Sequence, residues 1–512
     1  MNRRTLLLGG SALALAGVGA AGLAGALSPR RADLAGRPRL AMPRLVDTRE
    51  SGRLALAAQD GTVAFRDGVP SPTAGFDQDF LGPVIRMARG PLDVAIRNRR
   101  GVPVTTHWHG LMVPGEHDGG PHSQIAPGAD WTPDMEIDQP PATAFYHTHA
   151  HGRTAADVYA GLAGVVHVTD GRDDDRGLPA TYGVDDLTLV LQDRRFDGRG
   201  RMAYDLTMMD VMHGMTGDTL LINGQIAPVA VVPKGIVRLR LVNGSNARIY
   251  TLFFDDDRPL HLIATDGGFL DAPRALDRLR LAPGERAEVL VDLAQGSPPV
   301  LMSAGDPNQG PGRMMGRMRA VLDVLRDRSF EVLPFAIDEA QTARITRLPD
   351  ALDGTRPDLA SAVTGTRRIS LDMPMNMGGG MMGNGMMGGG MMGGGMMGSS
   401  GGDALFGLNG RPFAMERIDF TVQRGAVERW IVESPMLSHP IHVHGAMFQV
   451  VSEDGSAPRA ESLGWKDTVL VTGRSELFVR FDQPASRTHP FMVHCHILEH
   501  EDRGMMGQFT VT

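Results

Sequence analysis

The sequence predicts an all-β chain built from β-sandwich domains. Short stretches of alternating apolar and polar residues recur between turns rich in Gly, Pro and Asp, whereas helical periodicity is scarce. Clear examples are "LDVAIRN" (92–98), "GIVRLRLVN" (235–243), "AEVLVDL" (287–293) and "SELFVRFD" (475–482). Because a chain of 512 residues is too long for one ordinary core, we expect several such sandwiches in series.

Three blocks of predicted strands follow one another along the chain. The first block covers 45–172, the second 185–330 and the third 365–512. An Asn-Gly turn recurs in "LLINGQIAP" of the second block and in "GLNGRP" of the third. This weak repeat indicates that the blocks are domains of one type.

The first 26 residues are predicted to be a twin-arginine signal peptide. Arg3 and Arg4 precede a weakly apolar stretch rich in Gly and Ala, and 24–26 reads Ala-Gly-Ala, a cleavage pattern. We therefore expect export by the twin-arginine route to the periplasm or another extracytoplasmic compartment. If the leader stays uncleaved, it would instead anchor the chain in the membrane.

Charge and cysteine content narrow the possible partners. The net charge is −8 and the basic residues are spread along the chain, which argues against nucleic acid as a partner. The chain is expected to be a monomer. Because it contains one cysteine, Cys495, no intramolecular disulfide can form, and the thiol must have another role or none.

A Met- and Gly-rich insertion occupies residues 373–397 of the third block. It holds 11 of the 31 methionines, many of them in "MMGGG" repeats. Such a composition cannot build a packed core. Thioethers are soft ligands that select Cu(I), so the insertion is predicted to bind additional Cu(I). Smaller Met clusters occur near 208–215 and 314–318, where core filling is an equally good interpretation.

Histidines are paired far more often than chance allows. The 17 histidines would give about half of one His-x-His pair at random, yet five occur. They lie in "HWH" (107–109), "HTHAH" (147–151), "HVH" (442–444) and "HCH" (494–496). In a β-strand, residues two apart point to the same side. Four pairs could therefore aim eight imidazoles at one metal cluster.

A second set of ligands surrounds the single cysteine. Cys495 faces away from His494 and His496, and a loop could bring His500 and Met505 back toward its sulfur. If the preceding strand is extended, His439 also faces away from the paired histidines. Two His, one Cys and a weak Met are the ligands of blue-copper electron-transfer sites. Zinc is the competing interpretation, but a closed zinc site has no use for eight further imidazoles.

These motifs resemble those of the multicopper oxidases, and within them the bacterial laccase and periplasmic cuprous-oxidase branch. The matching stretches are "HWHGLMVPGEHDGGP", "FYHTHAHGRTAADVYAGLAG", "SHPIHVHG" and "HCHILEHEDRGMM". The resemblance spans essentially the whole chain after the leader. It implies three cupredoxin-like Greek-key β-sandwich domains and four copper ions: one type 1, one type 2 and two type 3.

The resemblance also implies a role for each matching residue. Type 1 copper would be held by His439, Cys495, His500 and the axial Met505. Type 2 copper would be held by His107 and His442. The type 3 pair would be held by His109, His147, His149, His444, His494 and His496, while His151 matches a position that is not a ligand. Asp118 and Glu501 would supply protons, although both could be ordinary loop acids bonded to the backbone.

The middle block is expected to bind no catalytic copper, because it contains only His213 and His261. The copper cluster should therefore lie between the first and third blocks. Each of these two blocks would supply four of the eight histidines.

The expected function is a multicopper oxidase that couples oxidation of Cu(I) to Cu(II), for copper tolerance, to reduction of O2 to water. The alternative is a laccase acting on phenols or aromatic amines. The cuprous oxidases carry an acid and a Met just upstream of "HPIHVHG", whereas "ESPMLSHP" has Pro435 and Leu437 near those places, with Glu433 and Met436 as possible substitutes. A non-enzymatic periplasmic copper-sequestering protein is a further alternative. A last alternative is a family member that kept the fold and lost the metals, as division-associated relatives have. Against this alternative, all ten His ligands and Cys495 are present here.

Overall fold

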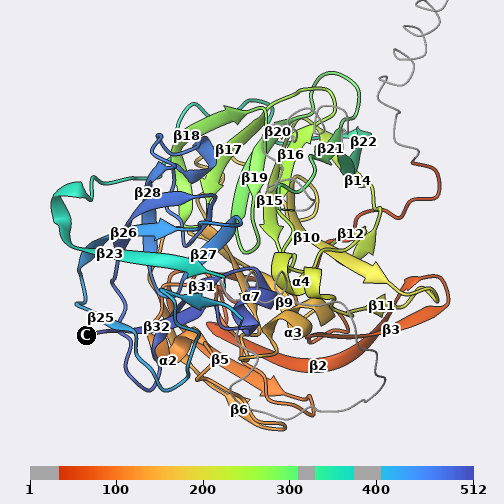
Figure 1. The fold of residues 1–512 in the computed structure, drawn as a ribbon. Helices are drawn as coiled ribbons and strands as arrows, with labels where there is room; N and C mark the ends of the chain where they lie inside the picture. Colours follow the sequence, from red (N-terminus) through yellow and green to blue (C-terminus); the bar gives the residue numbers. More distant parts are fainter. Residues whose placement is uncertain (1–33, 309–328, 374–404) are drawn as a thin grey trace, which may run out of the picture. The chain divides into compact units, whose positions relative to one another are not determined.

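The computed structural model describes residues 34–308, 329–373 and 405–512 (Figure 1). The chain divides into Met1–Arg37 and Pro38–Thr512, and every element named below belongs to the second unit. The predicted signal peptide and, apart from Met373, the Met-rich insertion lie outside the described residues. Within the described ranges, no helix has both the length and the apolar character needed to cross a membrane.

The all-β prediction is confirmed, and each block contains two sheets among the described residues (Figure 1). In the first block, one sheet has the order β1-β4-β9-β8 and the other β3-β2-β5-β6, with β7 also paired to β5. Their bounds are β1 Leu45–Asp47, β2 Arg53–Arg66, β3 Val69–Phe76, β4 Val84–Met87, β5 Gly90–Asn98, β6 Asp130–Trp131, β7 Asp134–Ile137, β8 Ala142–His147 and β9 Ala163–Val168.

The second block has an eight-stranded sheet, β13-β12-β10-β15-β20-β17-β18 with β11 beside β10, and a five-stranded sheet, β14-β22-β21-β16-β19. Its strands are β10 Asp186–Phe196, β11 Met202–Ala203, β12 Thr219–Ile222, β13 Gln225–Ile226, β14 Ala230–Lys234, β15 Ile236–Asn243, β16 Tyr250–Phe254, β17 Leu260–Thr265, β18 Gly268–Leu276, β19 Leu279–Leu281, β20 Arg286–Asp292, β21 Val300–Ser303 and β22 Phe330–Thr342. Strand β22 continues this sheet beyond residue 330, so the strands of the block reach past its predicted end.

The third block has two five-stranded sheets, β24-β23-β26-β30-β28 and β25-β32-β31-β27-β29. Its strands are β23 Val363–Asp372, β24 Gly407–Leu408, β25 Phe420–Val422, β26 Val427–Glu433, β27 His439–Val443, β28 Met447–Glu453, β29 Thr468–Val471, β30 Arg474–Arg480, β31 Phe491–Cys495 and β32 Met506–Val511. The second of these sheets carries His439, His442, His494 and Cys495.

One pairing pattern recurs in all three blocks. A parallel pair is formed by β2 with β5, by β10 with β15 and by β23 with β26. In each block the second strand of that pair then has an antiparallel neighbour on its other side: β7, β20 or β30. This repetition agrees with the expectation that the blocks are of one type.

The helices are short and lie in connections. They are α2 Gly115–Asp118, α3 Thr154–Ala160, α4 Met208–His213 and α7 Leu498–Asp502, with 3-10 turns at Ala360–Ala362 and Ala460–Ser462. The chain enters α7 directly after "HCH", so this helix presents His500 and Glu501 next to the metal-ligand motif. Asp502 at its end accepts hydrogen bonds from the first backbone N–H groups of α3, at 3.0 and 2.9 Å.

Candidate metal centres

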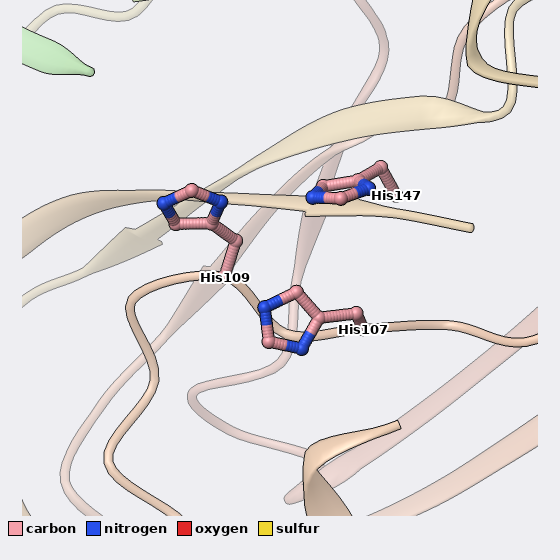
Figure 2. Close-up of side chains that lie close together, drawn as sticks. All are labelled: His107, His109 and His147. Atoms are coloured by element: carbon pink, nitrogen blue, oxygen red, sulfur yellow. The ribbon is translucent and has the colours of Figure 1, made fainter. Parts of the chain in front are cut away.

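The first-block histidines meet where the segment 107–109 crosses the end of β8 (Figure 2). The backbones of His107 and His147 are bonded to each other in an isolated antiparallel bridge, with N···O distances of 2.8 and 3.1 Å. Trp108 points the other way and is buried in the core of the first block. The predicted alternation of "HWH" is therefore present, although only a bridge and not a full strand supports it.

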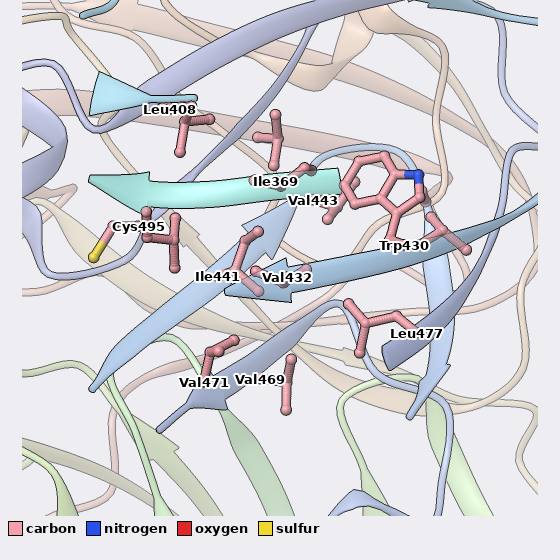
Figure 3. Packing of buried hydrophobic residues seen from close by; sticks show 14 of the residues in the cluster. Ile369, Leu408, Trp430, Val432, Ile441, Val443, Val469, Val471, Leu477 and Cys495 are labelled. Carbon is pink, nitrogen blue, oxygen red and sulfur yellow. The ribbon is translucent and has the colours of Figure 1, made fainter. Parts of the chain in front are cut away.

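The third-block histidines lie on two paired strands. His442 of β27 is opposite His494 of β31, and His444 and His496 follow the ends of these strands. Ile441 and Cys495 form the neighbouring register pair, and both side chains face the hydrophobic core (Figure 3). Strand parity thus separates the paired imidazoles from the thiol, as the sequence predicts.

The eight imidazoles form one buried cluster that joins the two blocks. Two ring nitrogens that are each about 2.0 Å from one ion, at a tetrahedral angle, lie about 3.3 Å apart. The closest nitrogen pairs across the cluster match this spacing, at 3.2–3.3 Å: His107 with His442, His149 with His494, His444 with His494, and His109 with His496. The buried side chains are therefore spaced as metal ligands.

The outer nitrogens of these rings are mostly tied to the protein. The Nδ1 atoms of His107, His147, His442 and His494 donate to the backbone oxygens of Asp118, Thr148, Asp467 and Cys495, at 2.8–3.0 Å. Partners of this kind orient a ligand ring and fix which nitrogen faces the metal. The Nε2 of His147, left facing the cluster, is buried without a hydrogen-bond partner, as expected for a nitrogen reserved for a metal.

Burial also keeps the imidazoles uncharged, which metal binding requires. It lowers the pKa of seven of the cluster histidines below the ordinary value, and neighbouring rings lower most of them further. These residues are His109, His147, His149, His442, His444, His494 and His496.

Asp118 and Glu501 both lie against the cluster. A carboxylate oxygen of Asp118 is 2.7 Å from His444 Nδ1 and 3.3 Å from His107 Nδ1. The carboxyl of Glu501 is 3.2 Å from His494 Nδ1 and 3.4 Å from His149 Nδ1. Burial, together with nearby Asp502, raises the pKa of Glu501 well above its usual range, which favours the protonated carboxyl.

A second buried ligand set surrounds Cys495. The donor atoms of His439, Cys495 and His500 lie within 4.8 Å of one another. A sulfur about 2.3 Å and a nitrogen about 2.0 Å from one ion, at about 120°, would be roughly 3.7 Å apart. The measured distance from Cys495 Sγ to His500 Nδ1 is 3.8 Å. This spacing fits the trigonal arrangement of blue-copper sites.

Met505 is fixed close to the cysteine by the backbone. The N–H of Cys495 donates to the carbonyl oxygen of Met505 at 3.0 Å, and the N–H of Met505 donates to that of His500 at 2.9 Å. The Met505 side chain is fully buried in the same hydrophobic cluster as Cys495. Burial raises the pKa of the Cys495 thiol well above its usual range, so in the absence of a cation the thiol stays protonated.

The remaining candidates lie elsewhere. His151 is exposed, and its ring packs against Phe413. Met208 and Met209 on α4 are 59% and 64% exposed and therefore fill no core, whereas Met215 is buried. Residues 314–318 lie outside the described ranges.

Sequence reasoning missed Asp467 and Arg286. Asp467 bonds to His109 and to the guanidinium of Arg286, which comes from the middle block. A weak signal exists in "GWKDTVL", where two charged residues run directly into the apolar strand β29. Charged residues are seldom buried unless they are paired, but the sequence does not reveal the partners.

Family models for multicopper oxidases match three stretches of this chain: 57–173, 187–309 and 384–512. The chain belongs to the multicopper oxidase family. The predicted cupredoxin-like β-sandwich architecture is therefore confirmed. Membership implies copper as cofactor, with O2 and a reducing substrate as reactants.

Solved structures of multicopper oxidases share this fold. The laccase-like multicopper oxidase CueO from Ochrobactrum sp. is 38% identical with a TM-score of 0.80, and the alignment covers 92% of this chain and 100% of that one. McoA from Aquifex aeolicus is 28% identical with a TM-score of 0.77, and the alignment covers 93% of this chain and 100% of that one.

The curated relatives bear a different kind of name. The chain is 38% identical over 482 residues to the cell division protein FtsP of Yersinia pestis, covering 92% of each protein. It is 36% identical over 490 residues to cell division protein FtsP of Escherichia coli, covering 94% of this chain and 95% of that one.

These relatives overturn the predicted function. The assignment as a cuprous oxidase for copper tolerance, with a phenol-oxidising laccase or a copper-sequestering protein as alternatives, is wrong. The physical reason is that ligand motifs specify which metal is bound and which electron chemistry is available. They do not specify the process that this chemistry serves, because one fold hosts many functions.

Proposed function

We propose that this protein acts in cell division, as the name of its FtsP relatives says of them, and that it does so as a copper-binding redox protein. The division role is supported by identity of 36–38% over more than nine tenths of the chain. The copper is supported by one observation above all: two buried sets of donor atoms at metal-ligand spacing.

In this proposal, His439, Cys495, His500 and Met505 hold type 1 copper, and His107 with His442 hold type 2 copper. The type 3 pair is held by His149, His444 and His494 on one side and by His109, His147 and His496 on the other. Bound copper would supply one-electron transfer between the two centres and the oxidase chemistry of the family, with O2 as acceptor.

The protein's own groups orient the ligands and handle protons. The carboxyl of Glu501, whose pKa is raised by burial, would donate a proton on the His149 and His494 side of the cluster. Asp118, bonded to His444 Nδ1, would hold that ring and pass protons on the opposite side. Export by the twin-arginine leader would place this chemistry in the periplasm, as a monomer.

The two parts of the proposal are tested separately. Protein loaded with copper should bind four ions per chain and show an intense blue absorption. A colourless protein that binds no copper at the cluster would contradict the redox part. For the division part, a strain lacking the gene should form filaments or chains of cells, and the exported protein should restore division. Normal division in the absence of the gene would contradict that role.

A further inference from the structure

A turn of the middle block reaches the histidine cluster, although this block supplies no ligand. The turn lies between β19 and β20, and Gly284 is at its tip with φ +80°. A Cβ added to Gly284 would lie 2.7 Å from Cδ2 and 2.8 Å from Nε2 of His496. The glycine backbone is therefore pressed against the ring of a ligand. In the described residues, the outer nitrogens of His149 and His496, both Nδ1, are buried without a hydrogen-bond partner. His149 Nδ1 lies 3.4 Å from the Glu501 carboxyl, whereas no ion pair is found for His496 Nδ1 in the same residues.

Two residues further along, Arg286 joins the three blocks at one point. Its guanidinium is fully buried and binds both carboxylate oxygens of Asp467 in the third block, at 2.7 and 2.6 Å. Its Nε donates to the backbone oxygen of Thr143 in the first block at 3.1 Å. It also donates to the carbonyl oxygen of Gly284 at 3.0 Å, which stiffens the turn.

Asp467 transmits this contact to two ligands. Its Oδ1 is 3.0 Å from His109 Nε2, and its backbone oxygen accepts from His442 Nδ1 at 3.0 Å. Because the carboxylate accepts a hydrogen bond from the N–H at His109 Nε2, the lone pair of His109 Nδ1 is left facing His496 Nε2, 3.2 Å away. A bidentate arginine–carboxylate pair fixes the orientation of the carboxylate more strictly than one hydrogen bond would.

We propose that the middle block positions the copper site formed by His109, His147 and His496, through Gly284 against one ring and through Arg286 and Asp467 against another. This inference rests on the proposed copper binding. Gly284 and Arg286 are positioning residues, because neither touches a metal or a reactant. The middle block thereby contacts the cluster from a third side, although all the ligands come from the first and third blocks.

The plain alternative is that Arg286 is one more buried ion pair that holds blocks together. Arg238 provides a direct comparison, because it is equally buried on the neighbouring strand β15 and pairs with Glu288. Within the part of the chain that the structure describes, the side-chain hydrogen bonds and ion pairs of Arg238 and Glu288 involve Asp173, Arg240 and Thr143 besides each other, and no cluster histidine. A purely structural role predicts the same outcome for changes at both arginines.

The test compares two variants with two matched controls. Gly284→Ala is matched by Gly425→Ala, where φ is +82° but an added Cβ meets nothing within 4 Å. Arg286→Lys keeps the positive charge and loses the paired guanidinium hydrogen bonds to the carboxylate, and it is matched by Arg238→Lys. Thermal melting of one sample of each copper-free protein verifies that it is folded. A separate, unheated sample is then loaded with copper. The number of copper ions bound per chain is measured at increasing chelator concentrations. The blue absorption reports the copper at the Cys495 site separately.

Gly284→Ala and Arg286→Lys should release cluster copper at about 10- to 100-fold lower chelator concentration than wild type, with the blue absorption intact. Both controls should retain copper like wild type. The inference would be overturned if the two variants retained copper like wild type, or if the controls lost copper equally. It would also be overturned if Gly284→Ala failed to fold where Gly425→Ala folds. If wild type itself bound no cluster copper, the proposed function would fail instead.

Discussion

Cys495 is joined by peptide bonds to His494 and His496, the proposed ligands of the other centre. An electron accepted at its sulfur would therefore have a short covalent path to the cluster. Replacing Cys495 by Ser removes the thiolate that gives a blue-copper site its colour. We expect Cys495→Ser to lose the blue absorption and one copper per chain, while the fold and the cluster copper remain. Copper counting with absorption spectroscopy checks this, and a blue Cys495→Ser protein would rule out the assignment.

Met505 is the proposed axial ligand of the same site and would tune its potential. A weak axial thioether stabilises the oxidised copper, so its removal should raise the reduction potential without removing the colour. Met505→Leu should therefore stay blue and show a higher potential in a redox titration. Met492→Leu is a suitable control, because Met492 is equally buried on β31 but is not part of the ligand set. A fall in the potential of Met505→Leu would show that another group is axial.

Asp306 is a buried carboxyl away from the histidines. It accepts from the N–H groups of Ile249 and Asn308, at 3.0 and 2.8 Å, and burial raises its pKa to about 6. Because the folded-state pKa is the higher one, the protonated form favours folding. This contribution is complete below about pH 4 and is lost as the pH rises through 6.

The Asp306→Asn variant should therefore gain stability over wild type as the pH rises from 4 to 7, by about 1–3 kcal/mol. Urea unfolding of both copper-free proteins at the two pH values measures this gain. A difference that stays constant or shrinks with pH would contradict the account.

Among the structural elements, the two recurring Asn-Gly turns share one backbone conformation and one hydrogen-bonding role. Asn223 and Asn409 both have φ +52°, and each side chain bonds a neighbouring strand. The Oδ1 of Asn223 accepts from Val190 N at 2.8 Å, and that of Asn409 accepts from Ser370 N at 2.8 Å. Asparagine suits both tasks because it tolerates the left-handed region and carries an amide.

Asn223→Ala should therefore lose about 2–3 kcal/mol of unfolding free energy, from backbone strain and lost hydrogen bonds. Asn223→Gly, which relieves the strain, should lose less. Urea unfolding of the copper-free variants measures the two losses. If Ala and Gly were equally harmful, the strain argument would be wrong.

Strands were the predictable elements, because alternation and turn residues are local signals. β5 alternates between buried and exposed, as its sequence indicates. β15 shows the limit of this reasoning, since all its residues are buried. Its polar face carries Arg238 and Arg240, which pair with Glu288 and Asp186 instead of facing solvent. Those partners lie on other strands, and no local pattern names them.

For the whole molecule, the clustering of the paired histidines was predictable, whereas the residues that contact the cluster from the middle block were not. Histidines spaced by two predict a metal site from the sequence alone. Arg286 and Gly284 look like ordinary strand and turn residues in the sequence, because their role depends on contacts between the blocks. The division role was equally out of reach. Nothing in the spacing of donor atoms says which process consumes the electrons.

We propose that this relative of division proteins retains complete copper centres. Anomalous X-ray scattering at the copper edge, from crystals of the copper-loaded protein, would locate the copper ions. We expect one peak among His439, Cys495 and His500, and three peaks among the eight clustered histidines. Empty density at both places, with the same side chains bonded only to one another, would contradict this proposal.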